Sequence, residues 1–465
     1  MTYDLICIGG GIANLALAYR TLKEREYDAW GNLEGKKVLI IEKGPKITTR
    51  ICPKTKLGYC VHCKPCRITT GFGGAGCFSD CKLTYSEEVG GTLIEHVGKE
   101  RFKELQDEAY HFFRELGADA PVYSNDEFFE QFKKECKENS LHLVESKVQH
   151  LGTEGSYELM CELAERLERM GCKIICDKTV IDINFDAKCI QLDDYSGYAY
   201  DKLSIAVGRY GSEWLRGICK KNNIPLEENS VDIGVRVEVP KTVLDPVTDN
   251  LYEMKIFNQT SGHSSVRTFC VNPGGWVVQE NYDEVNCVNG HSFAGTKSDN
   301  SNFALLHSIK FTEPFNNPIE YGKAICKLSN MLGDGNIIVQ RLGDIYNNKR
   351  TNKERLKNNS VRPTLKDAEP GDLRYAIPEK SLKAIVETLK KLDTVIPGVA
   401  NDDTLLYSPE VKFYSSKIKL NDMLQVPERD DLRDVYFLGD SSGVTHGIIQ
   451  ACMSGIWVAN NLNGK

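Results

Sequence analysis

Four cysteines are grouped in one short stretch of the sequence, and thiols at this spacing can hold a metal centre. Cys60, Cys63 and Cys66 are separated from one another by two residues, and Cys52 precedes them with Pro53 directly after it. A C-x2-C-x2-C run is typical of ferredoxin-like proteins that bind a [4Fe–4S] cluster, and a more distant Cys followed by Pro is also part of that motif. Structural zinc also needs thiolates but more often uses two separated pairs. The pattern predicts a [4Fe–4S] cluster, with zinc or four unrelated reduced cysteines as the alternatives.

Two further cysteines and a histidine are candidates for redox and proton chemistry. Cys77 and Cys81 could exchange electrons with a redox cofactor as a dithiol if one thiol is activated, or both could be small buried side chains. His446 directly precedes a predicted helix. It could deliver a proton during hydride transfer, or it could only line the start of that helix.

The N-terminal residues have the pattern of a dinucleotide-binding unit. A hydrophobic strand over residues 3–8 runs into three glycines that begin at Gly9, and a helix is predicted over residues 12–23. Such a turn has no Cβ atoms, so a pyrophosphate can approach the amide N–H groups at the positive end of the helix. A second strand ends at Glu42, whose carboxylate can accept the hydroxyl hydrogens of an adenosine ribose. Asn14 replaces the third glycine of the fingerprint.

A matching pattern for flavin binding lies at the C-terminus. A buried strand over residues 435–438 is followed by Gly439 and Asp440, and then by a helix that begins at Gly447. Asp440 would accept hydrogen bonds from the ribityl chain, and the amides of Gly447 and Ile448 would face N1 and the C2 carbonyl of the ring. This helix end would stabilise the negative charge of reduced flavin by about 1 to 2 kcal/mol. The two ends together predict one bound FAD.

A glycine-rich loop over residues 70–83 is predicted to lie near the isoalloxazine ring, because a backbone without side chains can approach a flat ring system. The strand over residues 203–207 ends at Gly208, a further sharp turn on the cofactor side, and the backbone at Val180 would bond the adenine edge. The predicted cofactor-binding residues are Gly9, Gly11, Ile12, Asn14, Glu42, Lys43, Gly73, Gly74, Ala75, Gly76, Val180, Gly208, Gly439, Asp440, Gly447 and Ile448.

Several motifs together resemble the family of largely uncharacterised FAD-dependent dehydrogenases. They are Gly73-Gly74-Ala75-Gly76, Phe78-Ser79-Asp80, residues 233–238, residues 267–275, Asn289-Gly290, Ile396-Pro397-Gly398 and the Gly439 motif. The likeness covers nearly the whole chain, and the cysteine loop resembles a clostridial-type branch of that family. It implies FAD and the two-domain fold of glutathione-reductase-like flavoproteins, without a substrate. The chain departs from the family pattern at Asn14, Cys77 and Cys81.

The expected fold is an α/β, Rossmann-like FAD-binding domain of the glutathione-reductase type with an inserted antiparallel-sheet substrate domain and a helical insertion. Helical periodicity marks the insertion, and strands separated by Gly, Asn and Pro mark the substrate domain. The predicted segments are residues 1–97, the first part of the FAD-binding domain, with the cysteine loop at 52–66; 98–150, the helical insertion; 151–230, the second part; 231–400, the substrate domain; and 401–465, the C-terminal part.

Composition limits the partners and the compartment. The chain has 465 residues, 41% of them hydrophobic, and a formal net charge of −7. This acidic balance argues against nucleic acid or an anionic membrane as the main partner. Seventeen cysteines without a secretion signal indicate reduced thiols, metal ligation or redox chemistry rather than a disulfide framework, and we expect a cytoplasmic protein.

The sequence therefore favours an FAD-dependent oxidoreductase that acts on a small organic substrate by hydride transfer at flavin N5. An iron–sulfur cluster would add a one-electron route from a ferredoxin-like donor, and NAD(P)H is the other candidate donor. The alternative is a flavin and iron–sulfur electron-transfer module that docks a protein partner. A flavin-dependent modifier of RNA is a third reading, which the acidic balance disfavours.

Overall fold

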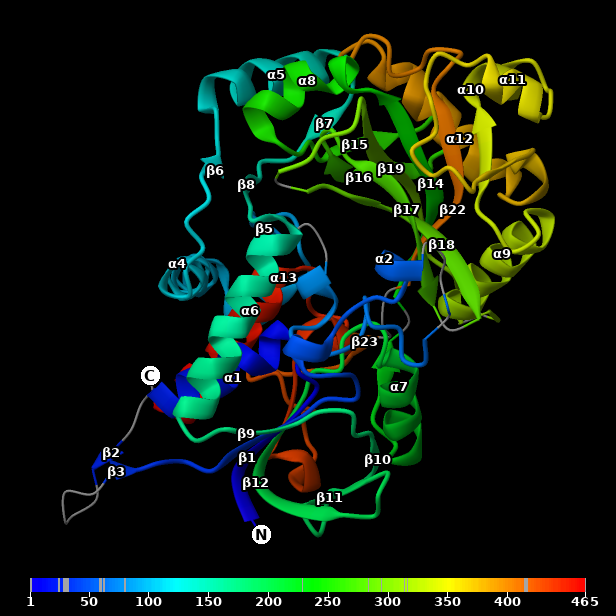
Figure 1. Ribbon diagram of the computed structural model, residues 1–465. Coiled ribbons are helices and arrows are strands. Elements are labelled where there is room, and N and C mark those ends of the chain that lie inside the picture. The colour runs from blue at the N-terminus through cyan, green and yellow to red at the C-terminus, as the bar shows by residue number, and fades with distance from the viewer. Residues whose placement is uncertain are drawn as a thin grey trace. The chain divides into compact units, whose positions relative to one another are not determined.

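The chain folds into two compact units (Figure 1). The computed structural model describes residues 2–23, 26–27, 33–57, 61, 63–78, 81–227, 229–282, 284–293, 295–312, 314–315, 317–413 and 417–464. Unit 1 comprises Met1–Ala120, His150–Asn229 and Ser415–Lys465, and unit 2 comprises Pro121–Gln149 and Ser230–Tyr414. No described helix has both the length and the apolar character needed to cross a lipid bilayer.

Unit 1 is built on a mainly parallel sheet. Its parallel strands lie in the order β9 (Lys173–Ile175), β4 (Val38–Ile41), β1 (Thr2–Ile8), β12 (Gly197–Ile205) and β24 (Val435–Phe437). The hairpin of β10 (Val180–Asn184) and β11 (Cys189–Leu192) extends the sheet from the first residues of β12. The central strands are almost continuously apolar because helices and loops cover both faces. This is the Rossmann-like α/β architecture that the sequence predicts.

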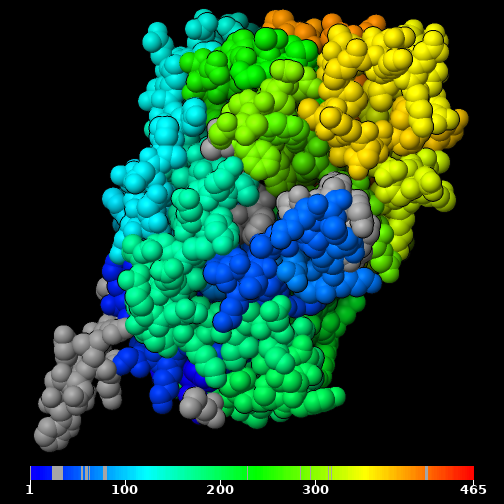
Figure 2. Space-filling model, in the orientation of Figure 1, coloured from blue at the N-terminus to red at the C-terminus, as the bar shows by residue number. Residues whose placement is uncertain are grey.

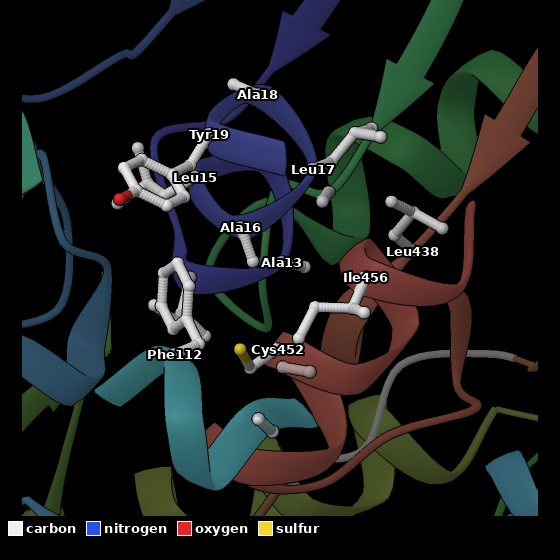
Figure 3. Packing of buried hydrophobic residues seen from close by; sticks show 14 of the residues in the cluster. Ala13, Leu15, Ala16, Leu17, Ala18, Tyr19, Phe112, Leu438, Cys452 and Ile456 are labelled. Atoms are coloured by element: carbon white, nitrogen blue, oxygen red, sulfur yellow. The ribbon is translucent and has the colours of Figure 1, made fainter. Parts of the chain in front are cut away.

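The first and last helices of the chain pack against each other in unit 1. In Figure 3, Ala13 and Ala16 of α1 (Ile12–Lys23) face Cys452 and Ile456 of α13 (Ile448–Leu462). Phe112 of α4 (Lys99–Glu115) belongs to the same buried cluster. The cluster therefore joins segments from both ends of the chain. The other elements of unit 1 are β2 (Glu26–Tyr27), β3 (Leu33–Glu34), α2 (Lys54–Leu57), β5 (Lys82–Tyr85), α3 (Leu93–Val97), α6 (Gly152–Arg169), α7 (Ser212–Lys221), β13 (Leu226–Glu227) and β23 (Lys417–Ile418).

Unit 2 contains an eight-stranded sheet that is antiparallel except for one strand pair at its edge. The strand order is β21 (Glu369–Pro370), β20 (Ile338–Arg341), β22 (Leu405–Lys412), β14 (Val231–Pro240), β19 (Asn300–Ile309), β16 (Ser265–Asn272), β15 (Ile256–Gln259) and β7 (His142–Leu143). A separate ribbon pairs β17 (Trp276–Tyr282) with β18 (Val285–His291). This is the antiparallel sheet expected for the substrate domain.

The long central strand β14 separates an apolar face from a polar one. Val235 and Val237 belong to the buried cluster formed with α8 (Lys241–Leu251) and α12 (Glu379–Leu392). The alternating residues Asp232, Arg236 and Glu238 are also buried but have ionisable side chains. A strand that alternates in this way places these side chains on one face of the sheet. The other elements of unit 2 are β6 (Val122–Tyr123), α5 (Asp126–Glu138), β8 (Lys147–His150), whose last residue is assigned to unit 1, α9 (Pro318–Leu332), α10 (Leu342–Tyr346) and α11 (Lys353–Lys357).

Two expected boundaries differ from the structure. The segment 98–150 is not one helical insertion: α4 belongs to unit 1, whereas α5 and the short strands β6 and β7 belong to unit 2. The C-terminal part of unit 1 begins at Ser415 rather than at residue 401, because β22 is a central strand of the unit 2 sheet. Both differences arise from pairing between distant segments, which local periodicity does not reveal.

Candidate cofactor site

Gly9 turns the chain from β1 into α1 and is held between the two neighbouring strands. Its N–H donates to the carbonyl of Ile41 at 2.8 Å, and the N–H of Ala206 donates to the carbonyl of Ile8 at 2.9 Å. The φ of Gly9 is +100°, and a Cβ there would lie 2.3 Å from the carbonyl oxygen of Ala206. Only glycine fits. The first amides of α1 therefore lie at the carboxyl edge of the parallel strands, which is where open α/β sheets bind phosphate groups.

Asn14 supports this turn from inside the protein. Its side chain is fully buried and donates from Nδ2 to the carbonyls of Ile8 and Gly9, at 2.8 and 2.9 Å. Its Oδ1 accepts a 2.6 Å hydrogen bond from the Ser204 hydroxyl on β12. Both N–H donors of the amide are thus used within the protein. Asn14, expected to contact the cofactor, positions the glycine turn through its side chain.

Glu42 lies directly beside the glycine turn. Its two carboxylate oxygens accept hydrogen bonds from the N–H groups of Gly10 at 2.7 Å and Gly44 at 2.8 Å. A carboxylate has about four acceptor positions, so these two bonds leave capacity for ligand hydroxyls. The neighbouring Lys43 is exposed, and its Nζ lies 5.4 Å from the centroid of the Tyr210 ring. Val180 is buried at the start of β10.

The glycine-rich loop connects the starts of the first and last helices. The N–H of Gly73 donates to the carbonyl of Gly10 at 2.8 Å, and a Cβ on Gly74 would lie 3.3 Å from Cα of Gly11. At the other end of the loop, a Cβ on Gly76 would lie 3.1 Å from Cγ1 of Ile448. Ala75 begins a short 3-10 helix, Ala75–Phe78. The first half of the loop therefore lies beside the glycine turn, and its second half lies beside the start of α13, where the flavin ring is predicted.

Arg50 holds this loop in shape, a role that sequence reasoning missed. The side chain is almost fully buried. Its guanidinium donates to five backbone carbonyls, those of Arg67 (2.8 Å), Ile68 (2.5 Å), Gly71 (3.3 Å), Phe72 (2.9 Å) and Gly74 (2.6 Å). No residue spacing in the sequence signals this role, because these five acceptors are main-chain atoms. Arg50 therefore converts a glycine-rich segment into a fixed surface beside α1.

Asp440 is fixed by two side chains at the end of β24. Its Oδ2 accepts from Nε of Arg209 and its Oδ1 from the Thr445 hydroxyl, both at 3.0 Å. The N–H of Val207 donates to the Ser441 hydroxyl at 3.1 Å, so the ends of β12 and β24 are joined. Gly439 lies beside α1 as well, since a Cβ there would be 3.3 Å from Cβ of Ala13. The sequence identified the acid but not its partner Arg209.

The start of α13 leaves space beside its first amides. Gly447 is the N-cap residue, and a Cβ on it would meet no described heavy atom within 4 Å. The same is true of Gly208 after β12. His446, half-buried, precedes the cap, and its N–H donates to the carbonyl of Gly90 at 2.7 Å. Open space at two of the predicted cofactor positions fits a bound group that the protein itself does not fill.

Comparison with known families adds a match in unit 2. Residues 230–412 match the family described as "FAD-dependent protein, C-terminal domain-like". This match supports FAD dependence, and with it the class of flavoprotein oxidoreductases. A comparison with curated proteins finds no significant match.

Three solved structures illustrate the structural similarity. L-proline dehydrogenase from P. horikoshii aligns with a TM-score of 0.45 and 13% identity, covering 100% of this chain and 94% of that one. Glycine oxidase from Geobacillus kaustophilus aligns with a TM-score of 0.41 and 12% identity, covering 100% and 95%. A mutant of 2-methyl-3-hydroxypyridine-5-carboxylic acid oxygenase aligns with a TM-score of 0.39 and 11% identity, covering 100% and 83%.

The predicted metal centre is not supported by the residues that the structure describes. Cys52, Cys63 and Cys66 are half-buried, and Cys60 lies outside the described residues. Among the described residues, no group of three or more His, Cys, Asp or Glu side chains could hold a metal ion. The three described cysteines therefore do not form such a group by themselves, the fourth predicted ligand is not among the described residues, and we derive no chemistry through a [4Fe–4S] cluster or zinc. Ile51 and Leu57, which flank Cys52 in the sequence, are exposed. Described residues of this part of the chain, drawn in blue, lie on the face of the molecule that Figure 2 shows.

Cys81 lies in the apolar core of unit 1. It is 3% exposed and belongs to the same cluster as Leu83 and Leu93. The side chain of Cys77 lies outside the described residues. The position of Cys81 favours a small buried side chain over one thiol of a dithiol, because a redox-active thiol needs access to its partner.

Proposed function

We propose that this protein is an FAD-dependent oxidoreductase that acts on a small organic molecule by hydride transfer at flavin N5. One observation supports this most directly. Within unit 1, the glycine turn at Gly9, the acid Glu42 and the glycine-capped start of α13 converge around the loop that ends at Gly76. The family match over residues 230–412 supports the same cofactor independently, from unit 2.

The residues around the glycine turn at the start of α1 fit the nucleotide part of FAD. The amides at the start of α1 would bind the diphosphate, since they carry the positive end of the helix dipole and lack partners within the helix. Glu42 would accept hydroxyl hydrogens of the ribose through its remaining acceptor positions. Asn14 and Arg50 would hold the turn and the loop in place for both contacts.

The residues between β24 and the start of α13 fit the flavin part of FAD. Bound FAD supplies a two-electron centre that accepts or donates hydride. The amides of Gly447 and Ile448 would stabilise negative charge at the N1 and C2 carbonyl edge by about 1 to 2 kcal/mol, which favours hydride acceptance. Asp440, oriented by Arg209 and Thr445, would accept from the ribityl hydroxyls. His446 would supply a proton beside this helix start.

The variant Gly447→Val tests the assignment. The protein has space for a side chain there and the φ of Gly447 is 174°, an extended conformation open to any residue, so the variant should fold with an unchanged thermal midpoint. If the flavin occupies that space, the variant should retain less than about a tenth of the wild-type FAD per chain, measured by extraction and chromatography.

Gly262→Val is the matched control, because Gly262 also lies in open space but in an exposed turn of unit 2. It should keep its flavin. Wild-type protein that is colourless and cannot be reconstituted with FAD would refute the proposal. Flavin that binds but is reduced only by a protein donor would indicate an electron-transfer module instead.

A further inference from the structure

Three cationic side chains surround one aromatic ring in unit 2. The ring of Phe269, on β16, has Nζ of Lys255 at 5.5 Å, the guanidinium carbon of Arg267 at 5.0 Å and Nζ of Lys412 at 5.5 Å from its centroid. Lys255 directly precedes β15, Arg267 lies on β16 and Lys412 ends β22. We call Phe269 and these three cations the Phe269 cluster.

The cations of the Phe269 cluster are largely withdrawn from water. The side chains of Lys255, Arg267 and Lys412 are 8%, 17% and 7% exposed. Lysine is almost never this deeply buried unless it is paired. Lys255 is paired with Glu253 at 3.2 Å, and Arg267 with Asp232 at 2.5 Å. Lys412 is paired with Glu410 at 2.9 Å.

Lys412 shares its carboxylate with another buried cation. Nε and Nη2 of Arg236 donate to both oxygens of Glu410, at 2.8 and 2.6 Å, and both side chains are 0% exposed. Burial acts to raise the pKa of Glu410, but the charges of Arg236 and Lys412 outweigh it and lower that pKa. Glu410 is therefore ionised at neutral pH. Glu410 is thus paired with two cations, and its single negative charge is already neutralised by the bidentate contact with Arg236.

An excess positive charge in a buried setting is costly unless an anion balances it. The surroundings of Lys412 favour a particular kind of anion. The half-buried face of Phe269 offers an apolar contact, and the guanidinium of Arg267 adds a second positive charge beside that ring. The ligand that fits is therefore a small organic molecule that carries a carboxylate.

We propose that Lys412, with Lys255 and Arg267 around Phe269, binds the carboxylate of the organic substrate. This inference rests on the proposed function, since it names the substrate class of that oxidoreductase. The site is formed by unit 2, within the segment that matches the FAD-dependent family. The mode of recognition is charge-assisted hydrogen bonding in a site of low dielectric, where such bonds are strong.

Isothermal calorimetry on the full-length flavoprotein tests binding. The probes are acetate, succinate and benzoate, with acetamide and benzamide as neutral counterparts. At least one carboxylate should bind saturably, and neither amide should bind. Because Phe269 supplies an aromatic face, benzoate should bind more tightly than acetate. The absence of saturable binding by all three carboxylates would overturn the inference.

The variant Lys412→Met identifies the site. Removing this cation leaves Glu410 matched by Arg236, so the variant should fold with an unchanged thermal midpoint. It should bind the carboxylate about tenfold more weakly or worse, and Lys412→Arg should restore most of the affinity. Lys383→Met, at an α12 position whose side chain is 76% exposed, is the control and should bind like wild type. Equal affinity in Lys412→Met and wild type would overturn the inference.

FAD per chain is measured in the same preparations. Full FAD occupancy without carboxylate binding refutes the substrate class alone and leaves the oxidoreductase proposal standing. Protein that cannot bind FAD refutes the proposed function, and the substrate inference fails with it even if an anion binds to the Phe269 cluster.

Discussion

At the scale of single residues, the candidate cofactor site depends on side chains that hold backbone in place. Asn14 bonds the carbonyls of Ile8 and Gly9, and Arg50 bonds five carbonyls between Arg67 and Gly74. A glycine-rich backbone has more freedom than any other, and ordering it costs conformational entropy. These two side chains restrict that freedom before a ligand arrives.

Arg50→Lys should weaken FAD binding while leaving the fold intact. Lysine keeps the charge but has a single ammonium, which cannot reach the five carbonyls that the planar guanidinium bonds. The loop at residues 71–74 would lose its fixed shape, and ligand binding would have to order it. We expect FAD affinity to fall about tenfold or more, measured by titrating FAD into apoprotein.

Arg67→Lys is the control in the same loop, because Arg67 makes one exposed hydrogen bond, from Nη1 to the carbonyl of Thr49 at 3.1 Å. Its FAD affinity should stay within about twofold of wild type. Similar losses in the two variants would show that the loss does not depend on the five carbonyl contacts of Arg50, and would contradict the ordering of the loop by this side chain.

At the scale of elements, the close crossing of α1 and α13 determines where their two starts lie. Gly455 of α13 is at the crossing, where a Cβ would lie 2.0 Å from the carbonyl oxygen of Ala13. Helices approach this closely only when one of them lacks a side chain at the contact. The positions of both helix starts, and so of the two expected ends of FAD, depend on this contact.

Gly455→Ala should therefore destabilise unit 1 and lower FAD occupancy. Alanine is the better helix former by about 1 kcal/mol, but the clash with backbone forces the helices apart and should cost a net of about 2 kcal/mol or more. Gly217→Ala in α7 is the matched control, since a Cβ there meets no described heavy atom within 4 Å. Chemical denaturation should show a loss for Gly455→Ala and a small gain for Gly217→Ala.

Local signals were enough to predict some elements. The strand before Gly9, the helix over residues 12–23 and the helix after Gly447 appear as β1, α1 and α13. Their apolar periodicity and glycine punctuation are contained in a few consecutive residues. By contrast, residues 98–150 read as helical although they contribute short strands as well, because two-residue strands form only through partners elsewhere in the chain.

At the scale of the whole molecule, the candidate site is assembled from segments distributed along the chain. The paired ends were predictable, because a glycine turn and a Gly-Asp-helix element each carry their own signal. The contacts of Arg50 and Arg209 could not be predicted, because an arginine that bonds main-chain carbonyls or a distant acid does not stand at a characteristic sequence distance from its partners. The Phe269 cluster was equally hidden, because Lys255, Arg267 and Lys412 meet only once the unit 2 sheet has formed.

The return of the C-terminal segment to the unit 1 sheet should be sensitive to acid. Asp434, directly before β24, is paired with Lys188 and Lys202, and its backbone carbonyl accepts from Leu203 N–H at 2.9 Å. Burial alone would raise the pKa of Asp434, but the hydrogen bonds from both lysines outweigh it and lower that pKa.

Because the pKa of Asp434 is lower in the folded state, its stabilisation is complete above the unfolded value of about 3.9 and is lost as pH falls through the folded value. The contribution of this ion pair to the free energy of unfolding, measured by urea denaturation, should fall as the pH is lowered below about 3.9. Asp434→Asn should be less stable than wild type at pH 6, by about 1 to 2 kcal/mol, and the difference should be smaller at pH 3. Asp201→Asn, at an exposed position of β12, is the control and should follow wild type at both pH values. A constant difference between Asp434→Asn and wild type across this range would show that the carboxylate charge does not hold β24 in place.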